Sequence, residues 1–590
     1  MKIENYLFVE LCDLSSTSLI KDGSRLVRGN AKALRLKYGD LCPIYIEESD
    51  DRAILTVGHP SFDGSINNKS FILEYNKKTN KHISDIDGEF LIIDFDKLSD
   101  EITVINSRFA SPQVFYALLD NKFVLSTAYY VLSKYLLSNK LSNIFTEKIY
   151  ESLLFRRLFG EDTYDSKSKC LQSASKLVYG KKINIEKYWH PEFSRNSYSL
   201  NDNANILNNL IDKSIRYKTS DNKRYGIMQS GGLDTRLILS RFDDMVPHAF
   251  NITYSKNKEY KIAKTLVEYK KGNFTWIQAK TGMYDQYFDY GSQITGGMFQ
   301  NSGLFYGHRD TIANDCDVLF SGYGMDYFFQ GMYLPSKMYS LFGELIPHYK
   351  TLDKINVNIV DYFINNISYK TKGFNLSDIM TTNQIANMQE SIRSSITRQA
   401  NEAKKNSDNL YDIYEYMSLG DLSKHYTYTG QLALMELTEY RTISYTNSIL
   451  EFYYKVPLKQ RFDAKILRKA LLMSDRRFYD LPSANHGLNA GYSSLMRSIS
   501  HIYKHLPERI GLREKKRNFE RTWLTAEEVL RSELLSRVHG LKKSEIIDHL
   551  NIVDMDKLRK IIGRWDENKV VGNQSLMMLL SVESFFKQQL

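Results

Sequence analysis

The sequence predicts an α/β protein in which a β-rich N-terminal domain precedes a doubly wound parallel sheet and a mostly helical C-terminal part. Three observations predict this fold. Short apolar or alternating runs, separated by turn residues, fill roughly the first 190 residues. Apolar strands then alternate with helical segments from about residue 205 to about residue 320, which is the spacing of a parallel sheet. Beyond about residue 380 the pattern is mostly helical.

The N-terminal region has the short apolar runs of a β domain. Its predicted strands are Ala53–Gly58, Phe71–Tyr75, Glu89–Phe95, Ile102–Asn106 and Lys122–Ser126. Turn pairs such as Asp63-Gly64 and Asp87-Gly88 separate the runs. Helical segments are predicted at Ser126–Ser138 and Thr146–Phe159.

A polar stretch rich in Ser and Asn, Pro191–Asn203, predicts a linker, and the pattern changes after it. The strands predicted there are Tyr225–Met228, His248–Tyr254, Phe274–Gln278 and Asp317–Phe320. The helices predicted between and before them are Ile206–Arg216, Asp234–Arg241 and Tyr260–Lys270. We therefore expect one domain over residues 1–190 and a second over residues 205–590.

The bulk composition limits the classes of function. Hydrophobic residues make up 42% and charged residues 25%, ordinary values for a globular protein with a core. The formal net charge of +10 is spread over 590 residues, which favours anionic ligands such as nucleotides but does not indicate nucleic acid. The four cysteines form no C-x-x-C pair, and no run of 18 apolar residues indicates a membrane span. The expected location is cytoplasmic.

The segment from Tyr225 to Leu239 runs from a strand through a glycine turn into a helix, and it predicts an anion site. Gly231 and Gly232 let backbone N–H groups approach an anion without a Cβ in the way. Ser230 and Thr235 add hydroxyl donors, and the N-terminus of the following helix favours negative charge.

Asp234, in the same loop, is unfavourable beside a phosphate unless a cation lies between them, so we interpret it as a Mg²⁺ ligand. The phosphate loop G-x-x-x-x-G-K-[ST] is absent. A loop that holds pyrophosphate suits attack at the α-phosphate of ATP, with AMP and pyrophosphate as products.

A second glycine segment, from Leu319 to Gly331, also follows a predicted strand. It places Gly322, Gly324 and one acidic residue, Asp326, at the carboxyl end of that strand, where ligands bind in open parallel sheets. Asp326 is the predicted second carboxylate for Mg²⁺.

The two motifs together, S-G-G-L-D-T from Ser230 and S-G-Y-G-x-D from Ser321, resemble the asparagine synthetase superfamily, which includes β-lactam synthetases and lasso-peptide cyclases. The resemblance implies a PP-loop domain that uses ATP and Mg²⁺ to adenylate a carboxylate, which nitrogen then captures as an amide. Ser230, Gly231, Gly232, Asp234 and Thr235 would hold pyrophosphate and metal, and Asp326 would share the metal. Arg441 and the stretch Lys465–Ala470 are similar to a late family motif, with Lys465 one position late, and Lys465 would lie near the phosphates.

The N-terminal region is similar to a class II glutamine amidotransferase domain of the αββα, Ntn-type fold. The similarity rests on Gly88–Phe90, Asp94, Arg108 and Phe115-Tyr116. Family members that use glutamine have a nucleophilic cysteine at position 2, where this sequence has Lys2. We therefore expect a degenerate, structural domain without glutaminase activity.

Tyr323 lies inside the second motif, where β-lactam synthetases have a tyrosine that helps to deprotonate an attacking amine. A tyrosine has a reference pKa of about 10, close to that of an alkylammonium at about 10.4. Tyrosine is therefore better matched than a carboxylate to taking a proton from an amine. The interpretation favours an amine nucleophile over free ammonia, and the alternative is that Tyr323 only packs beside the loop.

Two departures from the family pattern count against full activity. Tyr327 stands where the family has an acidic residue directly after the motif Asp. The late stretch Leu481–Tyr492 lacks the family lysine that stabilises the acyl-transfer transition state, and His486 is the predicted substitute.

The leading hypothesis is an AMP-forming carbon–nitrogen ligase that does not hydrolyse glutamine. Its substrates would be a small-molecule or peptide carboxylate and an amine, with no nucleic acid or membrane partner, and the interpretation allows a homodimer. One alternative is a nucleotide-binding scaffold that has lost catalysis and serves a partner enzyme. Another is asparagine biosynthesis from free ammonia.

Overall fold

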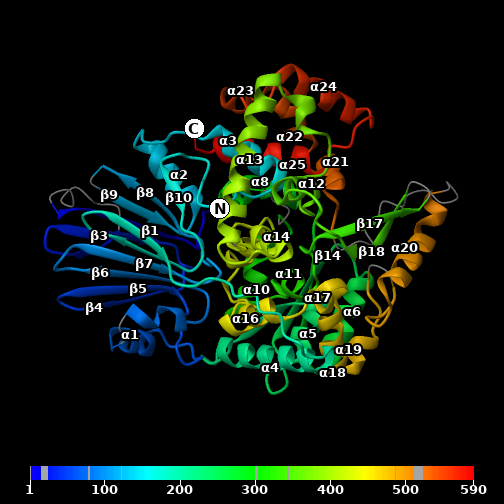
Figure 1. Ribbon diagram of the computed structural model, residues 1–590, viewed down its shortest axis with the longest axis horizontal. Coiled ribbons are helices and arrows are strands. Elements are labelled where there is room, and N and C mark those ends of the chain that lie inside the picture. The colour runs from blue at the N-terminus through cyan, green and yellow to red at the C-terminus, as the bar shows by residue number, and fades with distance from the viewer. Residues whose placement is uncertain are drawn as a thin grey trace.

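The computed structural model describes residues 2–14, 24–77, 80–120, 122–298, 303–341, 344–420, 422–484, 487–509 and 523–589. Two antiparallel sheets form one end of the molecule, and a parallel sheet surrounded by helices forms the other (Figure 1). A group of helices from the C-terminal part lies above the parallel sheet in the same view. This arrangement confirms the predicted α/β class.

The N-terminal sheets have six strands each. The first sheet has the order β10-β8-β9-β1-β3-β2, with β1 (Leu7–Asp13), β2 (Arg25–Arg28), β3 (Lys32–Tyr38), β8 (Phe115–Leu119), β9 (Lys122–Ser126) and β10 (Ser168–Cys170). The second has the order β12-β11-β7-β6-β5-β4, with β4 (Ile44–Glu48), β5 (Arg52–Gly58), β6 (Phe90–Asp96), β7 (Glu101–Asn106), β11 (Ser175–Tyr179) and β12 (Ile183–Lys187).

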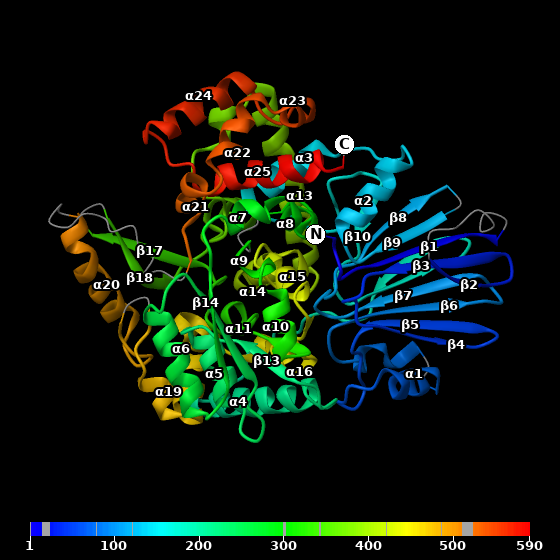
Figure 2. The same cartoon turned by 180° about the vertical axis from the view of Figure 1, so that it is seen from behind.

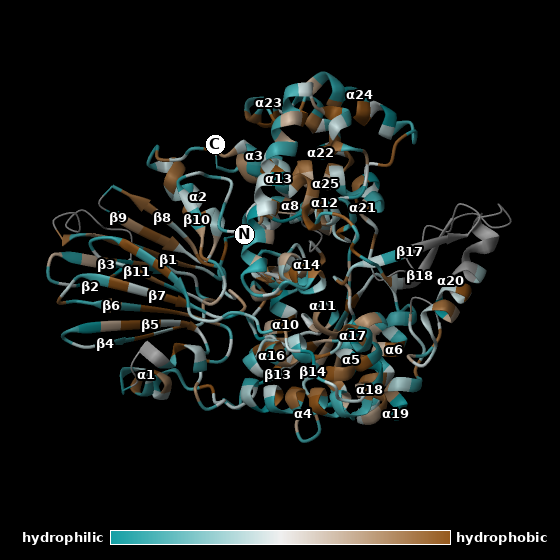
Figure 3. Ribbon diagram, in the orientation of Figure 1, coloured by the Kyte–Doolittle hydropathy of each residue, from teal (hydrophilic) through white to brown (hydrophobic). Residues whose placement is uncertain are grey.

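These two sheets share one apolar core because alternate side chains of each strand point to the inner face. Val9 and Leu34 of the first sheet cluster with Leu55 and Ile93 of the second. Figure 3 shows the hydrophobic residues along these strands. Helix α2 (Tyr129–Ser138) packs on β8 and β9, and helix α1 (Asn68–Lys77) packs on the second sheet. The four layers confirm the predicted αββα order.

The predicted strand Phe71–Tyr75 is wrong, because these residues lie inside helix α1. Phe71 and Ile72 are buried against Ile54 and Ile92 on the outer face of the second sheet. A five-residue apolar run does not distinguish a strand from one turn of an amphipathic helix, so packing decides the outcome here.

The parallel sheet has the order β15-β14-β13-β16-β19. Its strands are β13 (Tyr225–Met228), β14 (His248–Thr253), β15 (Phe274–Gln278), β16 (Val318–Phe320) and β19 (Glu439–Tyr440). The chain leaves β13 toward β14 and β15 on one side, then returns to place β16 on the other side. The loops after β13 and β16 therefore meet where the strand order reverses, the usual ligand position in this fold.

Helices cover both faces of the parallel sheet, as Figure 2 shows from behind. Those nearest the glycine loops are α4 (Leu200–Lys218), α5 (Leu233–Ser240), α6 (Lys258–Tyr269), α11 (Met325–Phe329), α18 (Lys465–Ser474) and α19 (Arg476–Asp480). Helix α4 begins inside the predicted linker, because Ser199 and Asp202 form a reciprocal capping box at its N-terminus. Helix α18 packs on α4 and α5.

The other helices near the parallel sheet are α7 (Met283–Gln286), α8 (Phe288–Thr295), α9 (Gly303–Tyr306), α10 (Arg309–Asp315), α16 (Asn447–Lys455) and α17 (Leu458–Arg461). A projecting arm consists of β17 (Ser336–Leu341), β18 (Glu344–Leu352) and α20 (Ser494–Arg509) (Figure 1).

The remaining helices are α3 (Thr146–Phe155), α12 (Ile359–Asn366), α13 (Thr382–Lys404), α14 (Leu410–Leu419), α15 (Tyr428–Met435), α21 (Ala526–Ser532), α22 (Leu535–Gly540), α23 (Glu545–Leu550), α24 (Met555–Asp566) and α25 (Asn573–Lys587). Helix α25 packs against both α8 and α3, so it joins the two parts of the molecule. Among the described helices, none combines the length and the apolar character that a membrane crossing needs.

Polar contacts that are partly buried join the N-terminal sheets to the C-terminal part of the chain. Glu89 accepts hydrogen bonds from the backbone N–H of Thr442 at 2.8 Å and from its hydroxyl at 3.0 Å. Lys218 forms an ion pair with Glu89, and Arg108 forms one with Glu451. A Cβ at Gly88 would lie 2.3 Å from the Tyr217 hydroxyl, so only glycine fits there.

The segment just before β1 is fixed to the C-terminal part of the chain by one carboxylate. Glu436, which is 3% exposed, accepts the backbone N–H groups of Glu4 and Asn5 at 3.0 Å each. Tyr290 donates its hydroxyl to the same carboxylate at 2.7 Å. These bonds satisfy a carboxylate that would otherwise be buried at high cost.

Candidate active site

The loops after β13 and β16 are in direct contact. A Cβ built on Gly322 would lie 2.8 Å from Cβ of Asp234 and 3.0 Å from the backbone nitrogen of Thr235. Such separations are shorter than van der Waals contact, so glycine is required for the two loops to approach. Two segments about ninety residues apart in the sequence therefore form one wall of a site, as strand order and motif position together require.

The first loop is organised by its own hydroxyl groups. Ser230 accepts the backbone N–H of Gly232 at 3.1 Å, and the hydroxyls of Ser230 and Thr235 are 3.2 Å apart. Gly232 occupies the N-cap of helix α5 and has an extended backbone conformation. The helix N-terminus, the two hydroxyls and the glycine N–H groups thus gather at one point, which is the arrangement that binds phosphate oxygens.

Asp234 and Asp326 form a pair of partly buried carboxylates. Burial raises the pKa of Asp234, and the charge of Asp326 raises it further. Burial also raises the pKa of Asp326. Gln330 donates from Nε2 to both carboxylate oxygens of Asp234, at 2.8 and 3.0 Å. Two acidic groups that disfavour each other's ionised form are a suitable pair for a divalent cation.

A cavity of about 480 Å³ opens beside the first loop. Its described lining comes from the loop itself, the segment after α11, the start of α18, the segment before α20 and α20. Arg468 and Arg497 reach the cavity and both form ion pairs with Asp463. Nη1 of Arg468 is buried with no hydrogen-bond partner among the described residues. A buried, unpaired guanidinium N–H in this position is a suitable donor for an anionic ligand.

The mouth of the cavity includes a strained backbone turn. Asp463 and Ala464 have φ values of 60° and 54° and line the cavity. The left-handed region costs an ordinary residue on the order of 1–3 kcal/mol, so the surrounding structure must enforce it. The turn directs helix α18, and with it Arg468, toward the loop.

Arg236 connects the glycine loop to the late part of the chain. Its guanidinium is 3% exposed and donates to the carbonyl oxygens of Gly231 at 3.0 Å and Leu481 at 2.7 Å. It also donates to Pro482 at 2.8 Å. Burial without a carboxylate partner lowers the pKa of Arg236 to about 10. The loop and the segment after α19 are therefore held in one arrangement.

The family comparison matches this part of the molecule. The family described as "Asparagine synthase" matches residues 207–479, which include both glycine loops, Arg441 and helix α18. The chain carries an asparagine synthase domain. This family consists generally of ATP-dependent ligases that form amide bonds.

Two solved structures are distant likenesses of this chain. One is the glutamine phosphoribosylpyrophosphate amidotransferase from B. subtilis complexed with ADP and GMP, at 7% identity and a TM-score of 0.18. That match covers 48% of this chain and 64% of that one, so it spans less than two thirds of that structure's length. A second, described as the allosteric regulatory enzyme of purine biosynthesis, has 8% identity and a TM-score of 0.20, covering 56% of this chain and 70% of that one. The comparison with curated proteins found no match.

Tyr323 of the asparagine synthase domain lies on the β16 loop between the two motif glycines. Ser444 donates its hydroxyl to the Tyr323 carbonyl oxygen at 2.7 Å, and the Tyr323 backbone N–H donates to Ser321 at 3.2 Å. The Tyr323 ring packs edge-on against the rings of Tyr327 and Tyr445, at 5.5 and 6.0 Å. Burial raises the pKa of Tyr323, so the phenol stays neutral near pH 7.

Tyr327 occupies the position after Asp326, and its hydroxyl lies 2.7 Å from that of Tyr445. The ring is 2% exposed, so this residue packs in the core under the loop. Its backbone N–H donates to Oδ1 of Asp326 at 2.9 Å, which orients the carboxylate.

The structure places the other predicted residues of the asparagine synthase domain in different environments. Lys465 is exposed at the start of α18, while Arg468, one helical turn later, reaches the cavity. Arg441 is 2% exposed and forms ion pairs with Asp221 and Glu439, which tie β19 to the end of α4. His486 lies outside the described residues.

Gln330 and Arg497 escaped the sequence reasoning, and Arg468 entered it only as part of the stretch Lys465–Ala470, with no role of its own. Gln330 follows Asp326 by four positions, so helical spacing could have indicated it. Arg468 lies three positions after Lys465, on the same face of α18 by the same rule. Nothing in the local sequence distinguishes Arg497, because α20 brings it to the cavity from 266 positions after Gly231.

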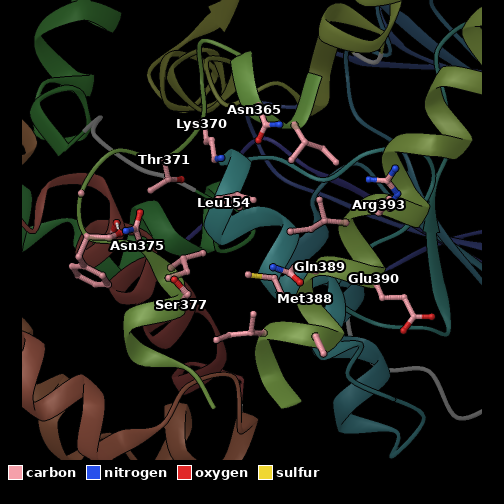
Figure 4. Close-up of a pocket in the computed structure, with 18 of the residues that line it drawn as sticks. Leu154, Asn365, Lys370, Thr371, Asn375, Ser377, Met388, Gln389, Glu390 and Arg393 are labelled. Atoms are coloured by element: carbon pink, nitrogen blue, oxygen red, sulfur yellow. Dashed lines mark hydrogen bonds between the residues drawn. The ribbon is translucent and has the colours of Figure 1, made fainter. Parts of the chain in front are cut away.

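A second cavity, of about 820 Å³, lies away from the glycine loops. It is formed by α3, α12, α13, the segment between α12 and α13, and the start of α25 (Figure 4). Leu154 and Met388 are among its apolar lining residues, and Lys370 and Arg393 are among its charged ones. None of the predicted site residues is among its described lining.

Proposed function

We propose that this protein is an AMP-forming ligase that adenylates a carboxylate with ATP and joins it to an amine, without hydrolysing glutamine. The observation that carries the proposal is the contact between the β13 and β16 loops at the reversal of strand order. That contact brings the glycine cradle of Gly231 and Gly232 beside the carboxylates of Asp234 and Asp326.

The residues present fit Mg²⁺ and the phosphates of ATP. Asp234 and Asp326 would hold the ion, because a divalent cation offsets the repulsion that raises the pKa of Asp234. The described residues contain no group of three or more His, Cys, Asp or Glu side chains suited to a metal, so phosphate oxygens and water would complete the coordination. When bound, Mg²⁺ supplies charge neutralisation on the phosphate oxygens.

The protein groups around the cradle would bind and orient the leaving diphosphate. The hydroxyls of Ser230 and Thr235 and the N-terminus of α5 face one point. Nη1 of Arg468, which lines the same cavity, would supply a charged donor. These groups would hold ATP beside the carboxylate. The barrier to their reaction would then be lower, because the entropy cost of bringing the two reactants together is met on binding.

The Tyr323 hydroxyl oxygen would accept a hydrogen bond from an N–H of the attacking amine. The residue stands on the loop that contacts Asp234, so it adjoins the place where the carboxylate would be activated. A neutral phenol oxygen can accept a hydrogen bond from an amine. The proposed substrate pair is accordingly a small-molecule or peptide carboxylate and an amine.

The N-terminal domain is proposed to be structural. All four cysteines of the chain are buried, and burial raises the pKa of Cys42 and of Cys316 to about 12, so these thiols are poor nucleophiles. Glu89 and Arg108, which belong to the amidotransferase-like motifs, are engaged in contacts with the synthetase part. This use supports a role in holding the two parts together.

ATP–pyrophosphate exchange tests the proposal. The purified protein is incubated with Mg-ATP, labelled pyrophosphate and one member of a panel of amino acids, peptides and sugar acids. Exchange that depends on a carboxylate supports the ligase. ATP binding with no exchange across the panel would favour the scaffold, and asparagine formed from aspartate, ATP and ammonium would favour asparagine synthesis.

Arg468 and Lys465 provide a matched pair on one helix. We expect Arg468→Met to raise the KM for ATP about tenfold or more, because a charged hydrogen bond to phosphate is lost. Lys465→Met, at an exposed position one turn away, should change that KM by less than about twofold. Exchange kinetics at varied ATP measure both values, and a larger effect of Lys465→Met would contradict the placement of the phosphates.

A further inference from the structure

A short chain of hydrogen-bonding groups runs from Tyr323 into the core. The Tyr323 hydroxyl lies 3.4 Å from Oγ1 of Thr427, and the same Thr427 oxygen lies 2.9 Å from Nδ1 of His425. The longer of the two contacts exceeds the usual O–H···O distance, as catalytic contacts often do before substrate binds. The segment that carries Thr427 and His425 lies between α14 and α15.

The geometry decides the direction of this chain. The backbone N–H of Thr427 lies 3.4 Å from Nδ1 of His425, so we assign Nδ1 as the acceptor and place the ring proton on Nε2, which is buried without a hydrogen-bond partner among the described residues. The Thr427 hydroxyl must then donate its own proton to Nδ1. Oγ1 of Thr427 can then only accept a hydrogen bond from Tyr323, which donates its phenolic proton.

The surroundings of His425 keep the ring neutral. His425 is 1% exposed, and its pKa is lowered well below 6.5 by burial and by the charges of Arg157 and Arg156. The titratable side chains whose rings or charges face it are Arg156, Arg157, Tyr327, Tyr333, Tyr369 and Tyr426. None of the groups in that set is a carboxylate that would stabilise an imidazolium, so Nδ1 remains an acceptor at neutral pH.

We propose that His425 and Thr427 are positioning residues that make the Tyr323 hydroxyl donate its proton to Oγ1 of Thr427. The Tyr323 oxygen can then accept a hydrogen bond from an N–H of the amine substrate. This inference rests on the proposed function, because it assigns the amine to Tyr323. The arrangement favours an amine that donates to Tyr323 and disfavours nucleophiles without an N–H or O–H to donate. Such nucleophiles would give the phenol oxygen no hydrogen bond from the substrate.

The hydrogen bonds from Tyr323 through Thr427 to His425 predict which variants lose amide formation and which retain it. Thr427→Val keeps the shape of the side chain and removes the hydroxyl, and we expect it to slow amide formation about tenfold while exchange changes by less than about twofold. Thr427→Ser keeps the hydroxyl and should retain both steps. Tyr323→Phe should slow the same step, and Thr427→Val should add little to it, because the two side chains act through one contact.

A second measurement does not depend on the substrate. Nitrogen NMR of histidine-labelled protein reports the tautomer of His425, assigned as the resonance that is lost in His425→Phe. We expect the neutral form with the proton on Nε2, a change of that signal in Thr427→Val, and no change in Thr427→Ser. A proton on Nδ1 would overturn the inference, as would fully additive losses in the double variant. Absence of exchange in the unaltered protein would instead reject the proposed function, and the tautomer would still report the direction of the chain.

Discussion

Asp234→Asn is expected to abolish ATP–pyrophosphate exchange, by at least about a hundredfold, while the protein remains folded. Asparagine has the same shape and can still accept a hydrogen bond from Gln330, so the loop should keep its conformation. What disappears is one of the two negative charges that face the proposed Mg²⁺. Exchange assays measure the loss, and far-ultraviolet circular dichroism checks the fold.

The control for this variant is Asp243→Asn, which neutralises a largely exposed aspartate of the same domain that pairs with Lys270. Exchange should be unchanged in the control, because exposed ion pairs contribute little. Normal exchange in Asp234→Asn would show that the metal lies elsewhere.

The same variant has a signature in the stability of the metal-free protein. The folded-state pKa of Asp234 is raised above its unfolded value of about 3.9, so the folded protein retains a proton that the unfolded chain has lost. The free energy of unfolding therefore falls as the pH rises above about 4. Asp234→Asn lacks this contribution and should become progressively more stable than the unaltered protein over that range. Denaturant unfolding at several pH values, with Asp243→Asn beside it, measures the difference, and parallel curves would contradict the burial of a protonated Asp234.

Gly322→Ala is expected to reduce exchange about a hundredfold, because displacement of about 1 Å at a reacting pair has effects of that size. The added methyl group would meet Cβ of Asp234 at 2.8 Å and the backbone of Thr235 at 3.0 Å. Neither neighbour is the flexible end of a side chain, so the two loops must separate. Exchange at saturating ATP and the KM for ATP together measure the effect.

Gly563→Ala is a suitable control, because no atom lies within 4 Å of the position its Cβ would take and it stands inside helix α24. Replacing glycine by alanine in a helix stabilises it by about 0.5–1 kcal/mol. This variant should therefore retain full exchange and unfold at a slightly higher denaturant concentration. If Gly322→Ala behaved like Gly563→Ala, the contact between the loops would not be required for activity.

The fold was largely predictable because its strands combine apolar side chains with sharp turn signals. Tyr225–Met228 and Phe274–Gln278 have the same bounds in the structure as in the prediction. Phe71–Tyr75 failed because a short apolar run fits a strand or a helix, and only the outer face of the second sheet selects the helix. The start of α4 was recoverable, since Ser199 and Asp202 have the spacing of a capping box.

The site was predictable as far as local sequence determines it. Ser230, Asp234 and Asp326 follow strands directly, so the positions of β13 and β16 in the sheet bring them together. The part of the cavity lining that contains Arg468 and Arg497 depends on tertiary packing. Helical spacing from Lys465 indicates Arg468, but the left-handed pair at 463–464 that directs this helix toward the loop has no local signature. Arg497 arrives on α20, and its position has no local signature either.

The carboxylate of Glu436, which accepts N–H groups of Glu4 and Asn5, has a consequence for how the chain is made. Those contacts join positions 431 and 432 residues apart, and Thr442 is the partner of Glu89 across 353 residues. At about 5–20 residues per second, a ribosome needs tens of seconds to deliver Glu436 after the first sheets have emerged. During that interval Glu89 lacks Thr442 as its hydrogen-bond donor, and Tyr129 of α2 lacks Phe585 of α25, on which it packs. The nascent N-terminal half should therefore remain open to chaperones until translation is well past its midpoint.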